Sequence, residues 1–323
     1  MKIALYFCAF LFNFCCWSQK KSDLEWLGLK GNVKSMDEID YHIFEDKTIE
    51  ERGKTSYTFN PKGIKSLVKY YKRYTNNKEY TSTITKFDSN GNAIEKISCA
   101  NDTLVINKTI LTYNSENHLI LENHYAQDQM LRETYQFIYD NKGNLTEKTV
   151  YAFGNYVLKN KYSYDEKNRL VLTEVYNQNF TKTGKYGIVY QNDKIIERNR
   201  WSTDNPKQIR TLFTYKANGK YKKEIEYENT LNIHEMEYEY DDFGNPLSLV
   251  ISYPNGTKMT TLKKFDHNNN MVEITEKIND EVKSKYFNTY QYDEYNNWIE
   301  RTWSDDENDK TPSRTKRIIS YYN

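Results

Sequence analysis

Cysteine is almost absent from this chain outside its first residues. Four cysteines occur among 323 residues, and three of them, Cys8, Cys15 and Cys16, lie in the N-terminal leader. Once the leader is removed only Cys99 remains, so an internal disulfide and a Cys/His metal cluster are both excluded. Packing and backbone hydrogen bonds must then supply the stability.

An excess of charge of one sign is also missing. The chain has 46 basic and 45 acidic residues, and residues 1–18 contain only Lys2 among them, which leaves 45 against 45. Nucleic acids and anionic membrane surfaces attract proteins with a strong positive excess. We therefore expect no nucleic-acid partner.

Long hydrophobic runs are limited to the N-terminus, where residues 3–17 are mostly apolar. One Lys before this run and the small Ser18 after it are typical of a secretory signal peptide. The run is shorter than the roughly 20 residues that span a bilayer. We predict a signal peptide over 1–18, cleavage before Gln19, and an exported protein without a transmembrane segment. Its location would be the periplasm, the outer cell surface or the medium; a single-pass anchor and a lipid anchor on Cys15 or Cys16 are the alternatives.

Aromatic residues are abundant, whereas glycine and proline are scarce. There are 30 Tyr and 14 Phe, against 12 Gly and 5 Pro. Disordered chains are poor in aromatic residues, so a polar chain with this composition must arrange its apolar residues in a pattern.

That pattern is a repeat. Ten copies start at an aromatic anchor residue, and successive anchors are separated by 28, 26, 26, 25, 26, 25, 25, 25 and 27 residues. Such a period indicates a tandem array of supersecondary units. The anchors are Phe59, Phe87, Tyr113, Tyr139, Tyr164, Tyr190, Tyr215, Tyr240, Phe265 and Tyr292.

Each copy reads as a β-hairpin. Residues 133–139 and 234–240 alternate between the two faces of a strand, which is the period of a sheet with one buried face. The following Asp, Asn and Gly residues tolerate the left-handed backbone of tight turns. We predict an all-β fold of tandem hairpins that form one curled antiparallel sheet or a partial spiral β-shell.

The ends of the array differ from its repeats. We expect an N-terminal cap over 19–53, made of a short helical turn at 22–28 and a capping strand at 32–44, and a hairpin array over 54–323. We expect an exposed acidic loop at 304–310, and 314–322 read as a final strand with nothing following it.

The motif Tyr-Asp-x-x-Gly-Asn followed by an apolar residue resembles the YD repeat of the Rhs family, which also occurs in teneurins and in the large subunits of bacterial toxin complexes. The resemblance covers roughly residue 54 to the C-terminus, although Asp is replaced at Asn60, Asn114, Gln191 and Lys216. The residues that carry it are Tyr139, Asp140, Gly143, Asn144, Leu145, Tyr164, Asp165, Tyr240, Asp241, Gly244, Asn245, Tyr292 and Asp293.

This resemblance implies a spiral β-sheet, which in the large family members forms a hollow shell around a toxin segment. The cleavage core and the variable toxic domain of those proteins have no counterpart in this sequence. The chain therefore resembles a short, stand-alone member whose repeat residues are structural.

No catalytic, cofactor-binding or metal-ligating set is discernible in the sequence. His118 is expected in a turn and His124 on the returning strand, and the aspartates of the turns recur in most copies, whereas a catalytic residue should be singular. The other histidines are His42, His234 and His267. The aromatic rows are interpreted as core, with sugar stacking as the alternative.

The leading functional hypothesis is an exported, non-enzymatic scaffold that binds a protein or a glycan at the cell envelope. A glycan-active enzyme with a site on the concave face of the sheet is the second hypothesis. The third is a partner of a toxin system, either a remnant of an Rhs-like shell or an immunity-type protein.

Overall fold

The structure, a computed structural model, describes residues 22–73, 80–101, 103–203, 207–305 and 311–322. Within them the chain forms one short helix and 22 antiparallel strands, which confirms the all-β prediction. No helix in the described ranges is long and apolar enough to cross a bilayer. The elements are α1 (Asp23–Trp26), β1 (Val33–Ile43), β2 (Ile49–Phe59), β3 (Lys65–Arg73), β4 (Tyr80–Phe87), β5 (Ala93–Ala100), β6 (Leu104–Tyr113), β7 (Leu119–Ala126), β8 (Leu131–Tyr139), β9 (Leu145–Ala152), β10 (Asn155–Tyr164), β11 (Leu170–Tyr176), β12 (Lys182–Gln191), β13 (Lys194–Ser202), β14 (Ile209–Tyr215), β15 (Tyr221–Glu228), β16 (Leu231–Tyr240), β17 (Pro246–Ser252), β18 (Lys258–Phe265), β19 (Met271–Ile278), β20 (Glu281–Tyr292), β21 (Trp298–Ser304) and β22 (Ser313–Tyr321).

In eight of the ten turns after the anchor residues, an Asp or Asn side chain accepts backbone N–H groups, as the turn after β8 illustrates. The Oδ1 atom of Asp140 accepts the backbone N–H groups of Lys142 (2.9 Å) and Asn144 (2.8 Å). Its Oδ2 atom accepts the side-chain amide of Asn144 at 2.9 Å. The fourth residue, Gly143, has a φ of +80°, which glycine adopts without strain.

A β-bulge follows each of these turns. In each of the ten hairpins that turn after an anchor residue, the pairing register shifts directly before the anchor, so that one residue of the returning strand has no partner. A bulge bends its strand and increases the local twist. Ten bulges at the same rim bend the sheet in the same sense, which favours closure.

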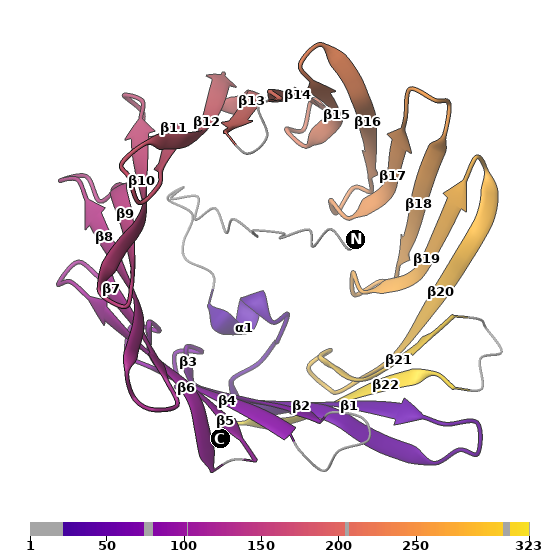
Figure 1. The fold of residues 1–323 in the computed structure, drawn as a ribbon. Coiled ribbons are helices and arrows are strands. Elements are labelled where there is room, and N and C mark those ends of the chain that lie inside the picture. Colours follow the sequence, from indigo (N-terminus) through magenta and orange to yellow (C-terminus); the bar gives the residue numbers. More distant parts are fainter. Residues whose placement is uncertain (1–21, 74–79, 102, 204–206, 306–310, 323) are drawn as a thin grey trace.

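The sheet is a closed barrel, so the predicted open sheet or partial spiral is wrong. Strand β1 pairs with β2 on one side and with β22 on the other, with Met36 opposite both Tyr57 and Ile319. The expected capping strand and the expected last strand are thus neighbours, and Figure 1 shows the resulting ring. Open twisted sheets rarely exceed about ten strands, and closure leaves no strand edge unpaired.

The N-terminal segment of the described chain, residues 22–32, lies inside the ring (Figure 1). Ser22 caps α1 in a capping box with Glu25. A carboxylate oxygen of Asp23 accepts the backbone N–H of Lys65 at 2.8 Å, which joins the helix to the turn between β2 and β3. The core cluster of the structure forms where this segment meets the wall, and it consists of Leu24, Leu29, Val33, Met36 and Phe59.

Replacing Gly143 with valine is expected to lower the free energy of unfolding by roughly 1 to 3 kcal/mol, because a β-branched residue is strained at positive φ. An added Cβ would also lie 3.0 Å from Cε1 of His118. Urea denaturation followed by circular dichroism measures the loss. Gly143→Asn is the matched control, since Asn117 and Asn168 occupy the same turn position at positive φ in other copies. Equal stability of the valine variant and the native protein would refute this role.

Candidate functional site in the lumen of the barrel

Met36 identifies the face of the sheet that points into the lumen. It is 0% exposed and packs against the N-terminal segment inside the ring. Residues that lie opposite one another on neighbouring strands share a face of the sheet, so the pairing registers identify the inward residues of each strand around the barrel. On β16 the inner face consists of His234, Met236, Tyr238 and Tyr240, as the alternation in the sequence predicted.

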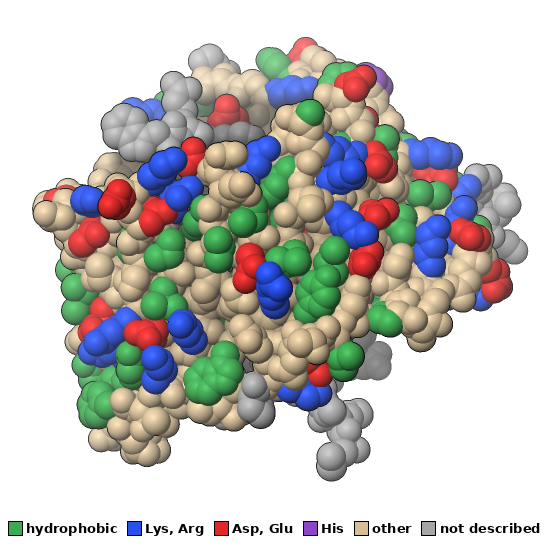
Figure 2. All heavy atoms as spheres, turned by 90° about the horizontal axis from the view of Figure 1, so that it is seen from above, with side chains coloured by type: hydrophobic (Ala, Val, Ile, Leu, Met, Phe, Trp, Pro, Cys, Tyr) green, Lys and Arg blue, Asp and Glu red, His purple; other side chains and the backbone are tan. Residues whose placement is uncertain are grey.

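The outer face carries ion pairs between neighbouring strands. On the side shown in Figure 2, basic and acidic side chains lie next to one another among scattered hydrophobic ones. Several glutamates bridge two strands, so their charges are compensated where water can also solvate them. The cross-strand pairs on this face are Asp37–Lys54 (2.8 Å), Glu95–Lys86 (2.6 Å), Glu95–Lys108 (2.7 Å), Glu147–Lys159 (2.6 Å), Glu174–Lys182 (2.9 Å), Glu197–Arg210 (2.7 Å), Glu235–Lys223, Glu273–Lys264 (2.8 Å), Glu300–Arg314 (3.3 Å) and Glu300–Lys316 (3.3 Å).

The motif residues that the sequence singled out lie at one rim of the barrel. The hydroxyl of Tyr139 donates to the carbonyl of Leu119, at the start of the preceding strand, at 2.9 Å. This contact joins consecutive hairpins, which phenylalanine could not do. The same bond joins Tyr113 to Ala93 (3.0 Å), Tyr164 to Leu145 (2.8 Å), Tyr190 to Leu170 (3.1 Å) and Tyr215 to Ile195 (2.6 Å).

The remaining motif residues build the turns or cover them. Asn144 bonds to Asp140 in its own turn and to the carbonyl oxygen of the Asn168 side chain in the next turn. Tyr292 donates to the carboxylate of Asp266 in the preceding turn. Three further aspartates each accept two backbone N–H groups in the way Asp140 does: Asp165 from Lys167 and Arg169, Asp241 from Gly244 and Asn245, and Asp293 from Tyr295 and Asn297.

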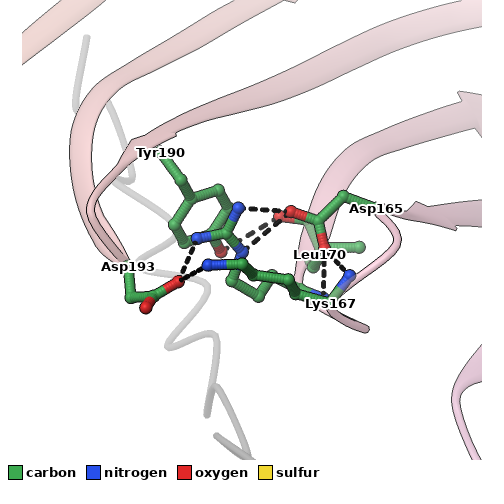
Figure 3. Close-up of polar contacts among 6 residues, drawn as sticks. Asp165, Lys167, Leu170, Tyr190 and Asp193 are labelled. Atoms are coloured by element: carbon green, nitrogen blue, oxygen red, sulfur yellow. Dashed lines mark hydrogen bonds and ion pairs between the residues drawn. The ribbon is translucent and has the colours of Figure 1, made fainter.

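The contact between the fifth and sixth turns uses charges (Figure 3). Arg169 donates to Asp165 in its own turn (2.8 Å) and to Asp193 in the next turn (2.9 Å), while its guanidinium lies 4.3 Å from the ring centroid of Tyr190. Lys167 also reaches Asp193, at 2.7 Å. These contacts hold adjacent hairpins together at the rim, and none of the six residues drawn belongs to the lumen clusters described below.

Acid should therefore destabilise the barrel through the aspartates of its turns. The hydrogen bond from the Asn144 side chain lowers the pKa of Asp140, and that from Arg169 lowers the pKa of Asp165. A lowered pKa in the folded state means that this stability is present above the ordinary value of about 3.9 and is lost as the pH falls through the folded value. We expect a constant melting temperature from about pH 7 to 5 and a decline below about pH 4.

Thermal melts at a series of pH values, followed by circular dichroism, measure this decline. Asp140→Asn is the matched variant, because Asn60 and Asn114 accept the same two backbone N–H groups without ionising. It should fold at neutral pH and lose less stability in acid than the native chain. A melting temperature that stays unchanged down to pH 3 would contradict the prediction.

A cluster of acidic side chains faces the lumen from β15. Glu224 lies opposite Met236 and Glu226 lies opposite His234, both on the inner face of β16. The hydroxyl of Tyr238 donates to Oε1 of Glu224 at 3.0 Å. Burial raises the pKa of the Glu224 carboxyl, although the Tyr238 hydrogen bond opposes this shift. The cluster thus combines a desolvated carboxyl group, a second carboxylate and a histidine.

A second cluster occupies the same positions on β7 and β8. His124 lies opposite Glu133, and its Nε2 atom is 3.0 Å from a carboxylate oxygen of Glu122. Its Nδ1 atom is 3.2 Å from the hydroxyl oxygen of Thr109. The Tyr135 hydroxyl donates to Glu133 at 2.7 Å, and burial together with this bond raises the pKa of Tyr135 to about 12. Both clusters present carboxylates, a histidine and a tyrosine to the lumen.

The sequence interpretation missed these inward carboxylates, because it assigned the recurring aspartates to the turns and found no copy with clustered carboxylates on a strand face. The usable signal was the strand position. Glu224 and Glu226 stand nine and eleven residues after their anchor, where the fifth and eighth copies have Thr173, Val175, Leu249 and Ile251. Charged residues occupy these inward positions in other copies as well, such as Glu122 in the third and Arg301 in the tenth, so the strand position locates inward charges without singling out one copy.

A pocket of about 360 Å³ lies beside the seam between β1 and β22. The guanidinium of Arg301 donates to the Thr315 hydroxyl at 3.2 Å, and that hydroxyl donates to Oδ1 of Asp40 at 2.7 Å. The ring of Trp303 stacks on Tyr286 with 5.2 Å between centroids. The lining residues are Asp40, Tyr41, His42, Arg52, Arg301, Trp303, Ser313, Arg314 and Thr315.

The remaining histidine and cysteine residues do not form a common site. His118 follows its turn directly and stacks on Tyr139, while His124 lies on β7 with its own partners. Cys99 is buried and free. Among the described residues, no three His, Cys, Asp or Glu side chains are grouped so that they could hold a metal ion.

Comparisons with known proteins give a partial family match and several similar solved structures. A family model described only as "Uncharacterised protein" matches residues 86–207, less than half of the chain. No curated protein matches. The structure of TcdB2-TccC3 is similar over 88% of this chain at 10% identity and a TM-score of 0.44, and this chain spans 18% of the length of that one.

Two porin-like proteins are also similar. One from Bacteroides uniformis is similar over 90% of this chain and 99% of its own, at 10% identity and a TM-score of 0.33. One from Bacteroides vulgatus is similar over 79% and 97%, at 13% identity and a TM-score of 0.28. Scores of this size carry no argument about function, which must come from the residues of the barrel.

Proposed function

We propose that this protein is an exported, non-enzymatic scaffold that binds a protein segment or a glycan at the cell envelope, and that the ligand lies in the lumen. The observation that carries this proposal is the division between the two faces of the wall. Tyrosine, histidine and unevenly placed carboxylates face inward, whereas regular ion pairs cover the outside.

The chemistry of the lumen favours a glycan over an apolar ligand. Aromatic rings offer flat apolar surface, and the carboxylates of Glu224 and Glu133 offer hydrogen-bond acceptors beside the rings of Tyr238 and Tyr135. A ligand with alternating apolar faces and hydroxyl groups matches this arrangement, because a few placed polar groups in an aromatic wall give orientation and specificity.

The outer wall supports a barrel that water surrounds. Charged residues on the lipid face of a membrane barrel cost about 2 to 4 kcal/mol each near the bilayer midplane. Here ion pairs such as Glu147–Lys159 and Glu174–Lys182 lie on that face. A membrane barrel instead presents a continuous apolar band to the lipid. The proposal that the protein is exported depends on the signal peptide predicted over residues 1–18.

We also infer that the hairpins are YD-type repeats. The turn contacts of Asp140, Gly143 and Asn144 support this, since each motif residue has a separate physical task in the turn. The anchor tyrosine supplies the contact to the preceding hairpin. This inference concerns ancestry and fold, and the binding proposal does not depend on it.

Two tyrosine variants on one strand pair would test the proposal. Tyr238→Ala removes an inward ring and Tyr227→Ala removes an outward one from the adjacent strand β15. A glycan array and a pull-down from envelope extract identify a ligand. Tyr238→Ala should then weaken binding by roughly tenfold, as expected when an aromatic anchor is truncated. Tyr227→Ala should bind like the native protein, and the opposite result would move the site to the outer wall.

The absence of catalysis is part of the proposal and needs its own test. If the lumen had a catalytic residue, Glu224 would be the best candidate. Its carboxyl is partly desolvated, and the carboxylate of Glu226 follows two residues further along the strand. Purified protein is expected to leave polysaccharides and peptidoglycan intact. If the protein hydrolysed one of these polymers and Glu224→Gln abolished the hydrolysis, the protein would be a glycan hydrolase and the scaffold proposal would be wrong.

A further inference from the structure

We propose that the pocket beside the seam binds an acidic sugar, a pyranose ring that carries a carboxylate. The proposal rests on the proposed function, a lumen that binds a ligand, and names one place and one ligand class within it. The pocket depends on barrel closure, because β1 and β2 contribute one part of its lining and β21 and β22 the other.

The charge of the pocket favours an anion. Its lining contains Arg52 and Arg301 but only one carboxylate, that of Asp40, together with Arg314, whose side chain pairs with Glu300 on the outer face. Arg314 lies 3.3 Å from Glu300 and is compensated by it. Arg301 has a hydroxyl group, that of Thr315, as its hydrogen-bond partner, so its charge is not neutralised by that bond.

Arginine recognises carboxylates by two parallel N–H···O bonds, and the position of the guanidinium decides whether it can do so. Thr315 fixes Arg301 on one side, and the Trp298 ring lies 5.5 Å from the guanidinium carbon on another. Asp40 accepts from Thr315 through one of its two oxygens. Thr315 thus links a fixed cation and a fixed acceptor within one pocket.

A simple inorganic anion would not use this arrangement fully. Asp40 repels an anion placed close to it but accepts hydrogen bonds from the hydroxyl groups of a sugar. Trp303, stacked on Tyr286, supplies a flat apolar surface for a ring. The volume of about 360 Å³ lies at the lower end of the range for small-ligand pockets, which suits one or two sugar rings.

Isothermal titration calorimetry of the full barrel with a trimer of galacturonic acid would test the proposal. A neutral galactose trimer and sodium sulfate are the comparison ligands. The galacturonate trimer should bind. The affinity for the neutral trimer should be lower by a factor of at least about ten, and sulfate should not compete with the galacturonate trimer at equal concentration. Trp303→Ala and Arg301→Gln should each weaken galacturonate binding by about tenfold or more.

Matched variants distinguish the loss of pocket contacts from the general effect of removing a tryptophan or an arginine. Trp201→Ala and Arg210→Gln alter the same residue types on the outer wall, and both should bind the galacturonate trimer like the native protein. Thermal melts show that every variant is folded. Since Trp303 also contacts Tyr286, Trp303→Phe is included and should retain part of the affinity.

Three results would overturn the proposal: no binding of the galacturonate trimer, equal binding of the acidic and neutral trimers, or competition by sulfate alone. Unchanged affinity in Arg301→Gln would do so as well. If an array ligand still requires Tyr238 but not Trp303, the lumen proposal stands and the pocket assignment fails. If neither residue affects any ligand, both fail.

Discussion

Lys316→Pro is expected to lower the free energy of unfolding by about 3 kcal/mol, because proline in a central strand removes a ladder hydrogen bond and leaves the partner group unpaired. Lys316 lies in the middle of the closing strand β22, opposite Ile39 of β1 and Glu300 of β21. A central strand uses each backbone N–H in one of its two ladders, so proline removes a bond on one side or the other. Its side chain faces outward, so no lumen contact changes.

Lys316→Ala is the matched control for this variant. It removes the ion pair with Glu300, in which the lysine side chain is 44% exposed, but keeps the backbone N–H. Exposed pairs of this kind contribute at most about 1 kcal/mol. Urea denaturation of the two variants gives the difference between them. Equal stability of the proline and alanine variants would show that β22 does not lie between β1 and β21.

Phe59→Ala is expected to cost about 3 to 5 kcal/mol, the range for removing a buried aromatic ring. Phe59 is 1% exposed and belongs to the cluster where the N-terminal segment packs inside the ring. Loss of the ring should leave a cavity beneath Leu24 and loosen α1. Phe243→Ala removes the same side chain from a turn where it is 84% exposed, and it should change stability by no more than about 0.5 kcal/mol.

Denaturation of both phenylalanine variants, followed by tryptophan fluorescence, measures these costs. Trp26 lies in α1 and adds a local probe of the segment. If Phe59→Ala were as mild as Phe243→Ala, the N-terminal segment would not be packed against the wall, and the lumen near β1 and β2 would be open.

The local structure of the strands could be predicted from the sequence because each rule acts within one hairpin. The inward row His234, Met236, Tyr238 and the outward Glu235 and Glu237 follow from period two alone, and the registers place them so. The left-handed turn position at Gly143 follows from the motif, and its φ of +80° agrees.

Closure could not be predicted in this way, because it depends on residues at opposite ends of the chain. Met36 and Ile319 lie opposite one another, yet nothing close to either in the sequence identifies its partner. Each end strand taken alone looks like the edge of a sheet. The bulges that bend the sheet also left no clear mark, because seven of the ten extra residues are Val, Ile or Leu, which are common at paired strand positions too.

The candidate site was hidden for the same reason. Glu224 and Glu133 could be assigned to the inner face from alternation, but whether that face is a packed core or an open lumen depends on closure. The seam pocket depends on it even more directly, because Asp40 and Arg301 come from opposite ends of the chain. A repeat shows how each unit folds, while the curvature of the array decides what its inner face can do.

Formation of a disulfide across the seam tests the central claim, closure of the barrel, most directly. Asp37 and Ile318 lie opposite one another on the outer face of β1 and β22. Directly opposed residues of antiparallel strands have Cα atoms about 4.5 to 5.5 Å apart, within the range of about 4.4 to 6.8 Å that a disulfide spans.

In a chain whose native cysteines are replaced by serine, Asp37→Cys with Ile318→Cys should form an intramolecular disulfide in nearly every molecule under mild oxidation. Mass spectrometry and gel mobility detect it, and the pair Asp37→Cys with Val189→Cys, in which the second cysteine lies on the distant strand β12, should form none. Free thiols in the seam pair, or disulfides only between molecules, would contradict closure and would show that the sheet is open.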